Sequence, residues 1–160
     1  MGTAQHGARM KIIAFDLGRN FAWAYNGSNV ILTGNVNFGT VSRAHRQGLL
    51  LTYLKRLFIQ IPYGVEAVIY ETPFARGRDA TRSLWGIAGI IEATATNAGL
   101  PVVDAAVPTI KKFATGHGKA CKEDMIAAAH KFGYKGDNEH EADSVCLLRY
   151  AEANLERVLK

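Results

Sequence analysis

The chain has 160 residues, the length of one domain, and 48% of them are hydrophobic with no low-complexity tract, so its composition is globular rather than disordered. No uncharged apolar run approaches the roughly 20 residues of a membrane-spanning helix, which excludes a membrane partner. Nineteen basic and fourteen acidic residues give a net charge of +5, which favours a polyanionic partner. Two cysteines, Cys121 and Cys146, are too few for a disulfide framework and favour a reducing, cytoplasmic compartment.

The first ten residues differ from the rest of the chain. "MGTAQHGARM" lacks the apolar core of a secretory signal and offers little to pack. Residues 1–10 are therefore predicted to be a disordered leader or a cloning remnant, and residues 11–160 a single domain.

The first half of that domain begins with strands. Residues 11–17 ("KIIAFDL") and 21–27 ("FAWAYNG") predict a hairpin, and 29–39 ("NVILTGNVNFG") the third strand of a meander. Apolar residues at helical spacing predict a helix between 41 and 61, ended by Pro62 and Gly64. Residues 66–71 ("EAVIYE") form a short apolar run typical of a buried parallel strand.

Helices dominate the second half. We expect a helix over 80–98, a fifth strand within 100–107, and helices over 108–116, 122–133 and from about 139 to the C-terminus. Three antiparallel strands, a crossover helix and two parallel strands predict an α/β fold with a five-stranded mixed sheet flanked by helices.

Two core strands end in an acid, Asp16 and Glu71. Binding sites collect beyond the carboxyl ends of strands in such sheets, so both groups point to one region. At a separation of about 5 Å they would repel by about 3 kcal/mol at an effective dielectric of about 20. A divalent cation would offset the repulsion, as would protonation of one acid. In the alternative interpretation, Asp16 caps a turn and Glu71 meets an arginine.

The last helix carries a second polar pair. His140 and Asp143 are three residues apart, so they share a face near the N-terminus of the helix. Asp143 also leans toward the packed side, where a carboxylate needs a partner. Glu139 and Glu141 are expected only to enrich the first turn in acid, as the helix dipole favours.

Taken together, "IAFDLG", "VIYETPF" and the late "HEAD" resemble the RuvC family of Holliday junction resolvases, over residues 11–150. The resemblance implies a ribonuclease H-like fold and a homodimeric endonuclease that cuts four-way DNA by two-metal hydrolysis. It also implies that Mg²⁺, or Mn²⁺ in its place, binds the catalytic residues, which are Asp16, Glu71, His140 and Asp143.

Two features set this chain apart within that resemblance. A histidine at the third position removes one negative charge and offers a nitrogen donor, so His140 is either a metal ligand or a proton carrier. "EADSVCLL" stands where the family has an Ala-rich stretch, which indicates a divergent member.

Basic residues cluster late in the chain, at Lys111, Lys112, Lys119 and Lys122. Lys111 and Lys122 match the two functionally important lysines of the resolvases, and all four are candidates to bind DNA. Gly116 and Gly118 are expected to leave their backbone amides free to approach phosphate. In the alternative, Lys112 and Lys119 are ordinary solvated residues.

The loop after Glu71 combines an aromatic residue with arginines. Phe74 and Arg76 suit stacking on a distorted base, and the family places a Phe three residues after its Glu, as here. Local packing is the alternative for Phe74. In the next helix, Trp85 lies in the region through which resolvases dimerise, or else it belongs to the core.

Three other functions are open alternatives. The chain could bind branched DNA without cutting it, with His140 as the sign of lost chemistry. It could be a ribonuclease H-like nuclease that acts on RNA or hybrid duplexes. "FDLG" also resembles the phosphate loop of sugar kinases and actin-like ATPases, although those need a second lobe for which 160 residues leave no room.

Overall fold

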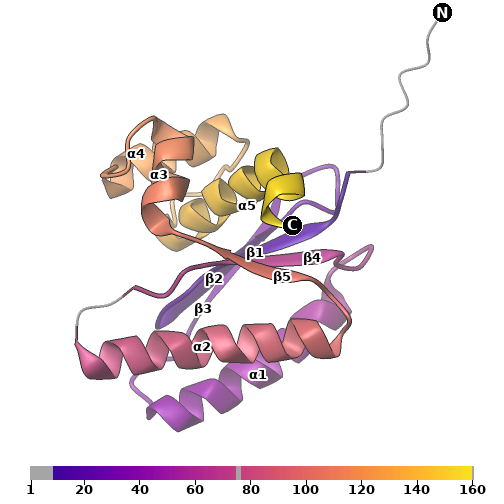
Figure 1. Ribbon diagram of the computed structural model, residues 1–160, viewed down its shortest axis with the longest axis vertical. Helices are drawn as coiled ribbons and strands as arrows, with labels where there is room; N and C mark the ends of the chain where they lie inside the picture. The colour runs from indigo at the N-terminus through magenta and orange to yellow at the C-terminus, as the bar shows by residue number, and fades with distance from the viewer. Residues whose placement is uncertain (1–8, 75–76, 160) are drawn as a thin grey trace, which may run out of the picture.

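The computed structural model describes residues 9–74 and 77–159, which form one sheet between two helical layers (Figure 1). The elements in chain order are β1 (Ile12–Asp16), β2 (Asn20–Tyr25), β3 (Leu32–Asn37), α1 (Arg43–Gln60), β4 (Ala67–Glu71), α2 (Arg78–Asn97), β5 (Val102–Ala105), α3 (Val107–Thr115), α4 (Lys122–Lys131) and α5 (Glu139–Val158).

The sheet has the order β3-β2-β1-β4-β5. β1 pairs with β2 and β2 with β3 in antiparallel fashion, whereas β1–β4 and β4–β5 are parallel. The predicted five-stranded mixed sheet is therefore confirmed, and the expected elements differ from the observed ones mainly in their end residues.

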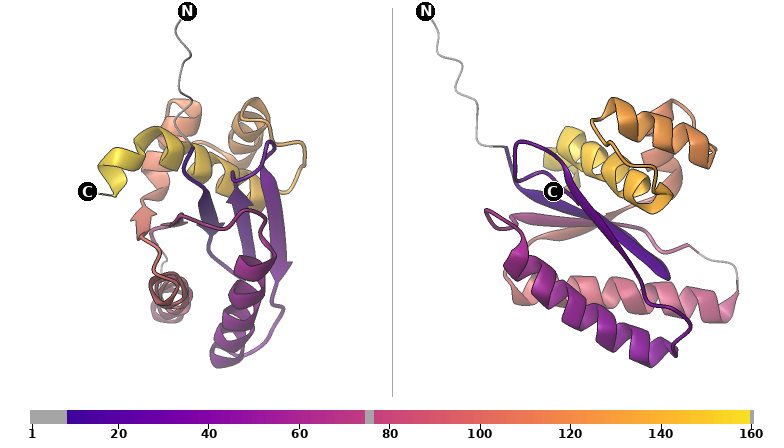
Figure 2. Two further views of the ribbon diagram at one scale, coloured as in Figure 1. Left: turned by 90° about the vertical axis from the view of Figure 1, so that its right-hand side faces the viewer. Right: turned by 180° about the vertical axis from the view of Figure 1, so that it is seen from behind.

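Each face of the sheet has its own core. Helices α1 and α2 cover one face, and α3, α4 and α5 the other, as the side and rear views show (Figure 2). Along β1, Ile12 and Ala14 join the core beneath α5, whereas Ile13 and Phe15 join the core against α1 and α2. Because strand side chains alternate between faces, a residue's position in this alternation decides which helical layer it meets.

Local sequence signals fix the helix ends near the site. Asn138 accepts hydrogen bonds at Oδ1 from the backbone amides of His140 and Glu141, both at 3.0 Å, and so caps the start of α5. Helix α3 has Pro108 in its first turn and ends at Gly116, whose φ of 91° lies in the left-handed region that glycine tolerates. These caps hold α5 and the lysine-bearing α3 at fixed positions over the sheet.

The described part of the N-terminal segment contacts the domain. Arg9 forms an ion pair with Glu152 of α5, and Met10 packs against the core beneath that helix. Residues 1–8 of the predicted leader lie outside the described residues. In the described part of the chain, no helix combines the length and apolar character needed to cross a membrane.

Candidate functional site

Two acids stand side by side at the end of the central parallel strands. Asp16 continues the alternation of Ile12 and Ala14 on β1, and Glu71 continues that of Ala67 and Ile69 on β4, so both acids face α5. The parallel register pairs Phe15 with Tyr70, which brings the next two residues, Asp16 and Glu71, alongside each other.

Helix α5 brings the other two predicted residues to the same place. The Nδ1 atom of His140 lies 2.8 Å from Oδ2 of Asp16, whose side chain is almost fully buried. Asp143 follows one turn later and interacts electrostatically with both strand acids. The structure therefore assembles Asp16, Glu71, His140 and Asp143 into one cluster where β1, β4 and α5 meet.

Burial and mutual repulsion perturb the acids. Burial raises the pKa of Glu71 well above its ordinary value, and the charges of Asp16 and Asp143 raise it further. Burial also raises the pKa of Asp143 to about 7, with Asp16 as the next cause. The pKa of Asp16 is raised by burial too, although its hydrogen bond with His140 acts in the opposite direction. The cluster thus holds more negative charge than its buried position favours.

Lys111 supplies a compensating charge. Its charge lowers the pKa of both Glu71 and Asp143, although burial outweighs it in each. The ammonium group donates a hydrogen bond of 2.8 Å to the carbonyl of Ala120, which anchors it near the acids. Lys111 therefore belongs to the cluster itself.

Both ring nitrogens of His140 have partners. The hydrogen bond with Asp16 is the main reason that the pKa of His140 is raised. On the other side of the ring, Nδ2 of Asn20 lies 3.2 Å from Nε2, whereas Oε1 of Glu139 lies 3.6 Å from it, beyond hydrogen-bonding distance. Asn20 was not predicted as a site residue, because "GRN" has the composition of a turn. Its position could have indicated it, since Asn20 begins β2, which pairs with β1, the strand that ends in Asp16.

The donor set suits a hard divalent cation. Three carboxyl groups match the oxygen ligands that Mg²⁺ and Mn²⁺ prefer, whereas the imidazole is a softer nitrogen donor. Among the described residues, no three His, Cys, Asp or Glu side chains are already arranged as a cation-binding cluster. Asp16 instead hydrogen-bonds to His140, so a cation bound at Asp16 would have to replace this contact.

Of the other predicted DNA-binding lysines, Lys122 contacts the helix that carries His140 and Asp143. Lys122 forms an ion pair of 2.6 Å with Glu139, the neighbour of His140 on α5. Lys112 on α3 and Lys119 in the following loop are both exposed. The expected role of Gly116 is wrong, because its amide donates to the carbonyl of Lys112 at 2.9 Å to close α3 and is not free for phosphate.

The aromatic candidates are solvent-exposed. Phe74 is 80% exposed just beyond Glu71, so it does not serve local packing, whereas Arg76 lies outside the described residues. Trp85 on α2 is 50% exposed and is not a core residue.

Glu141 has a different role from its neighbours His140 and Asp143. Its carboxylate accepts hydrogen bonds from Thr33 at 2.6 Å, from Asn35, and from the hydroxyl of Tyr134 at 3.1 Å. These bonds tie α5 to β3 and to the loop before α5. Sequence reasoning assigned Glu141 only to the helix dipole and did not foresee this connection.

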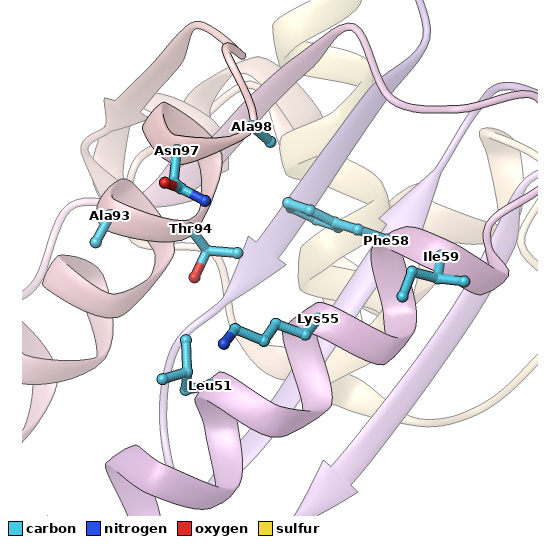
Figure 3. A pocket seen from close by; sticks show the side chains of 8 residues that line it. All are labelled: Leu51, Lys55, Phe58, Ile59, Ala93, Thr94, Asn97 and Ala98. Carbon is cyan, nitrogen blue, oxygen red and sulfur yellow. The ribbon is translucent and has the colours of Figure 1, made fainter.

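A cavity of about 570 Å³ lies elsewhere, between α1 and α2 on the opposite face of the sheet (Figure 3). Leu51, Lys55 and Phe58 of α1 face the last turns of α2 across it. Among the described residues that line it, Lys55 is the one with a charge, so this part of the lining lacks the grouped acids on which the candidate chemistry depends.

No protein-family model matches the sequence, and no curated protein matches it. Among solved structures, the chain is similar to RuvC of Thermus thermophilus, with a TM-score of 0.69 and 20% identity over 94% of this chain and 99% of the other. It is also similar to T. thermophilus RuvC in complex with a Holliday junction substrate, with a TM-score of 0.72 and 19% identity over 91% and 96% of the two chains. The chain therefore has the ribonuclease H-like fold of these structures, as the sequence predicted.

Proposed function

We propose that this protein is a metal-dependent endonuclease that resolves four-way DNA junctions. The proposal rests on the convergence of four side chains from three separate elements at one buried site, namely Asp16, Glu71, His140 and Asp143. The three acids of this site repel one another. The T. thermophilus protein with a Holliday junction substrate shares the fold, which supports this choice of substrate.

The carboxylates of Asp16, Glu71 and Asp143 would hold the cations. Bound Mg²⁺ or Mn²⁺ supplies activation of a water molecule and stabilisation of the leaving oxygen in phosphodiester hydrolysis. The rigid strands beneath Asp16 and Glu71 keep these two groups from moving apart under their own repulsion. Lys111 partly balances the charge of Glu71 and Asp143.

DNA would approach along the exposed lysines and Phe74. Lys112, Lys119 and Lys122, which contribute to the net charge of +5 of the chain, would attract the phosphate backbone. Phe74, 80% exposed beside the acids, can stack on a base at the branch point. Arg76, two residues further along, is proposed to assist it.

A homodimer would give the paired cuts that junction resolution requires. Helix α2 supports this proposal, because Trp85 is half-exposed and an added Cβ at Gly89 would meet nothing within 4 Å. At Gly86, in contrast, Gln47 of α1 already approaches closely. Sedimentation of the parent and of Trp85→Ala tests the dimer, which the substitution should weaken.

Cleavage of a synthetic four-way junction in Mg²⁺ or Mn²⁺ tests the function. We expect paired cuts by the parent and a loss of more than about 100-fold in Asp16→Asn, with junction binding retained. Binding without cleavage by the parent would favour a non-catalytic junction-binding protein. Equal rates on linear duplex, RNA–DNA hybrid and junction would favour a broader ribonuclease H-like nuclease.

A further inference from the structure

A chain of side-chain hydrogen bonds runs from the edge of the sheet into the acid cluster. Asn37, at the end of β3, is paired directly across the sheet with Asn20, at the start of β2. The Nδ2 group of Asn37 donates to Oδ1 of Asn20, and Nδ2 of Asn20 lies 3.2 Å from Nε2 of His140. His140 then contacts Asp16 through Nδ1.

A backbone amide sets the direction of this chain. The N–H group of Gly39 lies 2.7 Å from Oδ1 of Asn37, and a backbone N–H can only donate. Oδ1 of Asn37 must therefore face Gly39, which turns its Nδ2 toward Asn20. Gly39 has a φ of 65°, a conformation that glycine adopts without strain, so the anchoring turn suits its sequence.

The remaining orientations follow from the first. Asn20 must present Oδ1 to the amide donor of Asn37, so its own Nδ2 donates toward His140. Nε2 of His140 is then the acceptor, and the proton of the neutral ring is on Nδ1, where it is donated to Asp16. Both asparagines are exposed to solvent, but each amide is held at both of its ends.

We propose that Asn20 and Asn37 are positioning residues that hold His140 in its Nδ1–H form and so fix Oδ2 of Asp16. The orientation of His140 would then be set by the β2–β3 hairpin as well as by α5. The importance of this for DNA cleavage rests on the proposed nuclease function, whereas the assignment of the ring proton does not.

The edge of the sheet, through Asn37 and Asn20, thereby helps to orient His140 in the site. With Nε2 engaged by Asn20 and Nδ1–H by Asp16, His140 acts first as a hydrogen-bond donor that orients an acid. A cation would have to displace Asn20 to use the lone pair of Nε2, the ring nitrogen that carries no proton.

Nitrogen NMR tests the assignment directly. In ¹⁵N-histidine-labelled protein at about pH 8, without divalent cations or DNA, a long-range ¹H–¹⁵N spectrum shows which ring nitrogen carries the proton. His140→Asn identifies the His140 signals among those of the five histidines. We expect Nδ1 in the protonated range and Nε2 in the unprotonated range; the reverse pattern in the parent overturns the proposal.

Asn37→Asp makes the test sharper, because the new carboxylate has almost the same shape and cannot donate to Asn20. The Asn20 amide should rotate by 180° and present its oxygen to His140, which requires a proton on Nε2. We expect kcat for junction cleavage to fall about 10- to 100-fold with little change in KM. Asn29→Asp, at an exposed loop position, introduces the same charge and should leave both the spectrum and kcat unchanged.

Each outcome separates the two proposals. A folded Asn37→Asp protein, verified by its backbone amide spectrum, that keeps the parent's His140 pattern contradicts the role of the asparagines. If the parent shows the expected ring proton but cuts no junction with Mg²⁺ or Mn²⁺, the positioning network stands and the nuclease function fails.

Discussion

At the scale of single residues, the most informative feature is the side of the sheet on which each acid lies. Asp16 and Glu71 end neighbouring parallel strands in the same alternation, so both face α5. A shift of one residue in either strand would move one acid to the α1–α2 face and separate the pair. The acids form a cluster because the alternation of buried side chains along both strands places them on the same face of the sheet.

Asp143 provides a pH-dependent prediction at this scale. Its pKa is raised from 3.8 to about 7, so the folded protein favours the protonated carboxyl group, and ionisation of Asp143 destabilises the fold. The stabilisation is complete below about pH 4 and is lost as the pH rises through about 7. Without divalent cations, Asp143→Asn should raise the free energy of unfolding at pH 8 by on the order of 3 kcal/mol and have little effect near pH 4.

Urea unfolding in a chelating buffer at both pH values measures this difference. Asp137→Asn is the matched control, because the side chain of Asp137 is 96% exposed ahead of the same helix and should show no comparable gain. If Asp143→Asn raised the free energy of unfolding equally at both pH values, the raised pKa of Asp143 would not be the cause.

At the scale of elements, α5 is the part that completes the site. It carries His140 and Asp143, its start is capped by Asn138, and Glu141 ties it to β3. The helix therefore has one set of polar residues for the cluster and another for its own attachment. The expectation that the first-turn acids serve only the dipole holds for neither Glu139, which pairs with Lys122, nor Glu141.

Glu141→Ala should destabilise the fold by about 1–3 kcal/mol, because the partly buried hydroxyls of Thr33 and Tyr134 lose their acceptor. Urea unfolding measures this loss. Glu123→Ala, an exposed acid in the first turn of α4, should cost less than about 1 kcal/mol. Equal effects of the two substitutions would rule out a tie between α5 and β3.

Lys122 gives a prediction for the α4–α5 surface. Its ion pair with Glu139 is exposed, so it contributes little to stability and a phosphate can compete for the lysine. Lys122→Ala should weaken junction binding and lower the slope of log K against log salt by about 1. Lys55→Ala, on α1 across the sheet, serves as the control in a fluorescence titration at several salt concentrations (Figure 3). An unchanged slope for Lys122→Ala would exclude a phosphate contact.

At the scale of the whole molecule, the fold brings mutually repelling carboxylates together at one site, and a bound cation can relieve this repulsion. Binding of Mg²⁺ or Mn²⁺ to the folded chain should raise its stability by about 2.7 kcal/mol at a concentration 100 times the dissociation constant. Thermal unfolding with and without the ions measures this as a rise in Tm. Asp16→Asn should lose most of that rise, and a rise that persists in full would place the bound cation elsewhere.

The amino-acid sequence by itself determined the elements and their order. The alternation in β1, the continuous apolar run of β4 and the helical spacing around α1 are local patterns, and each follows from the geometry of its own segment. The sequence also identified the four cluster residues, through motifs whose order matches a known family.

Only the tertiary structure decided which side chains meet. The contacts of His140 with Asp16, of Asn20 with His140, and of Glu141 with β3 join residues more than 100 positions apart. Such contacts depend on strand register and helix placement, which the whole core sets and no local pattern encodes.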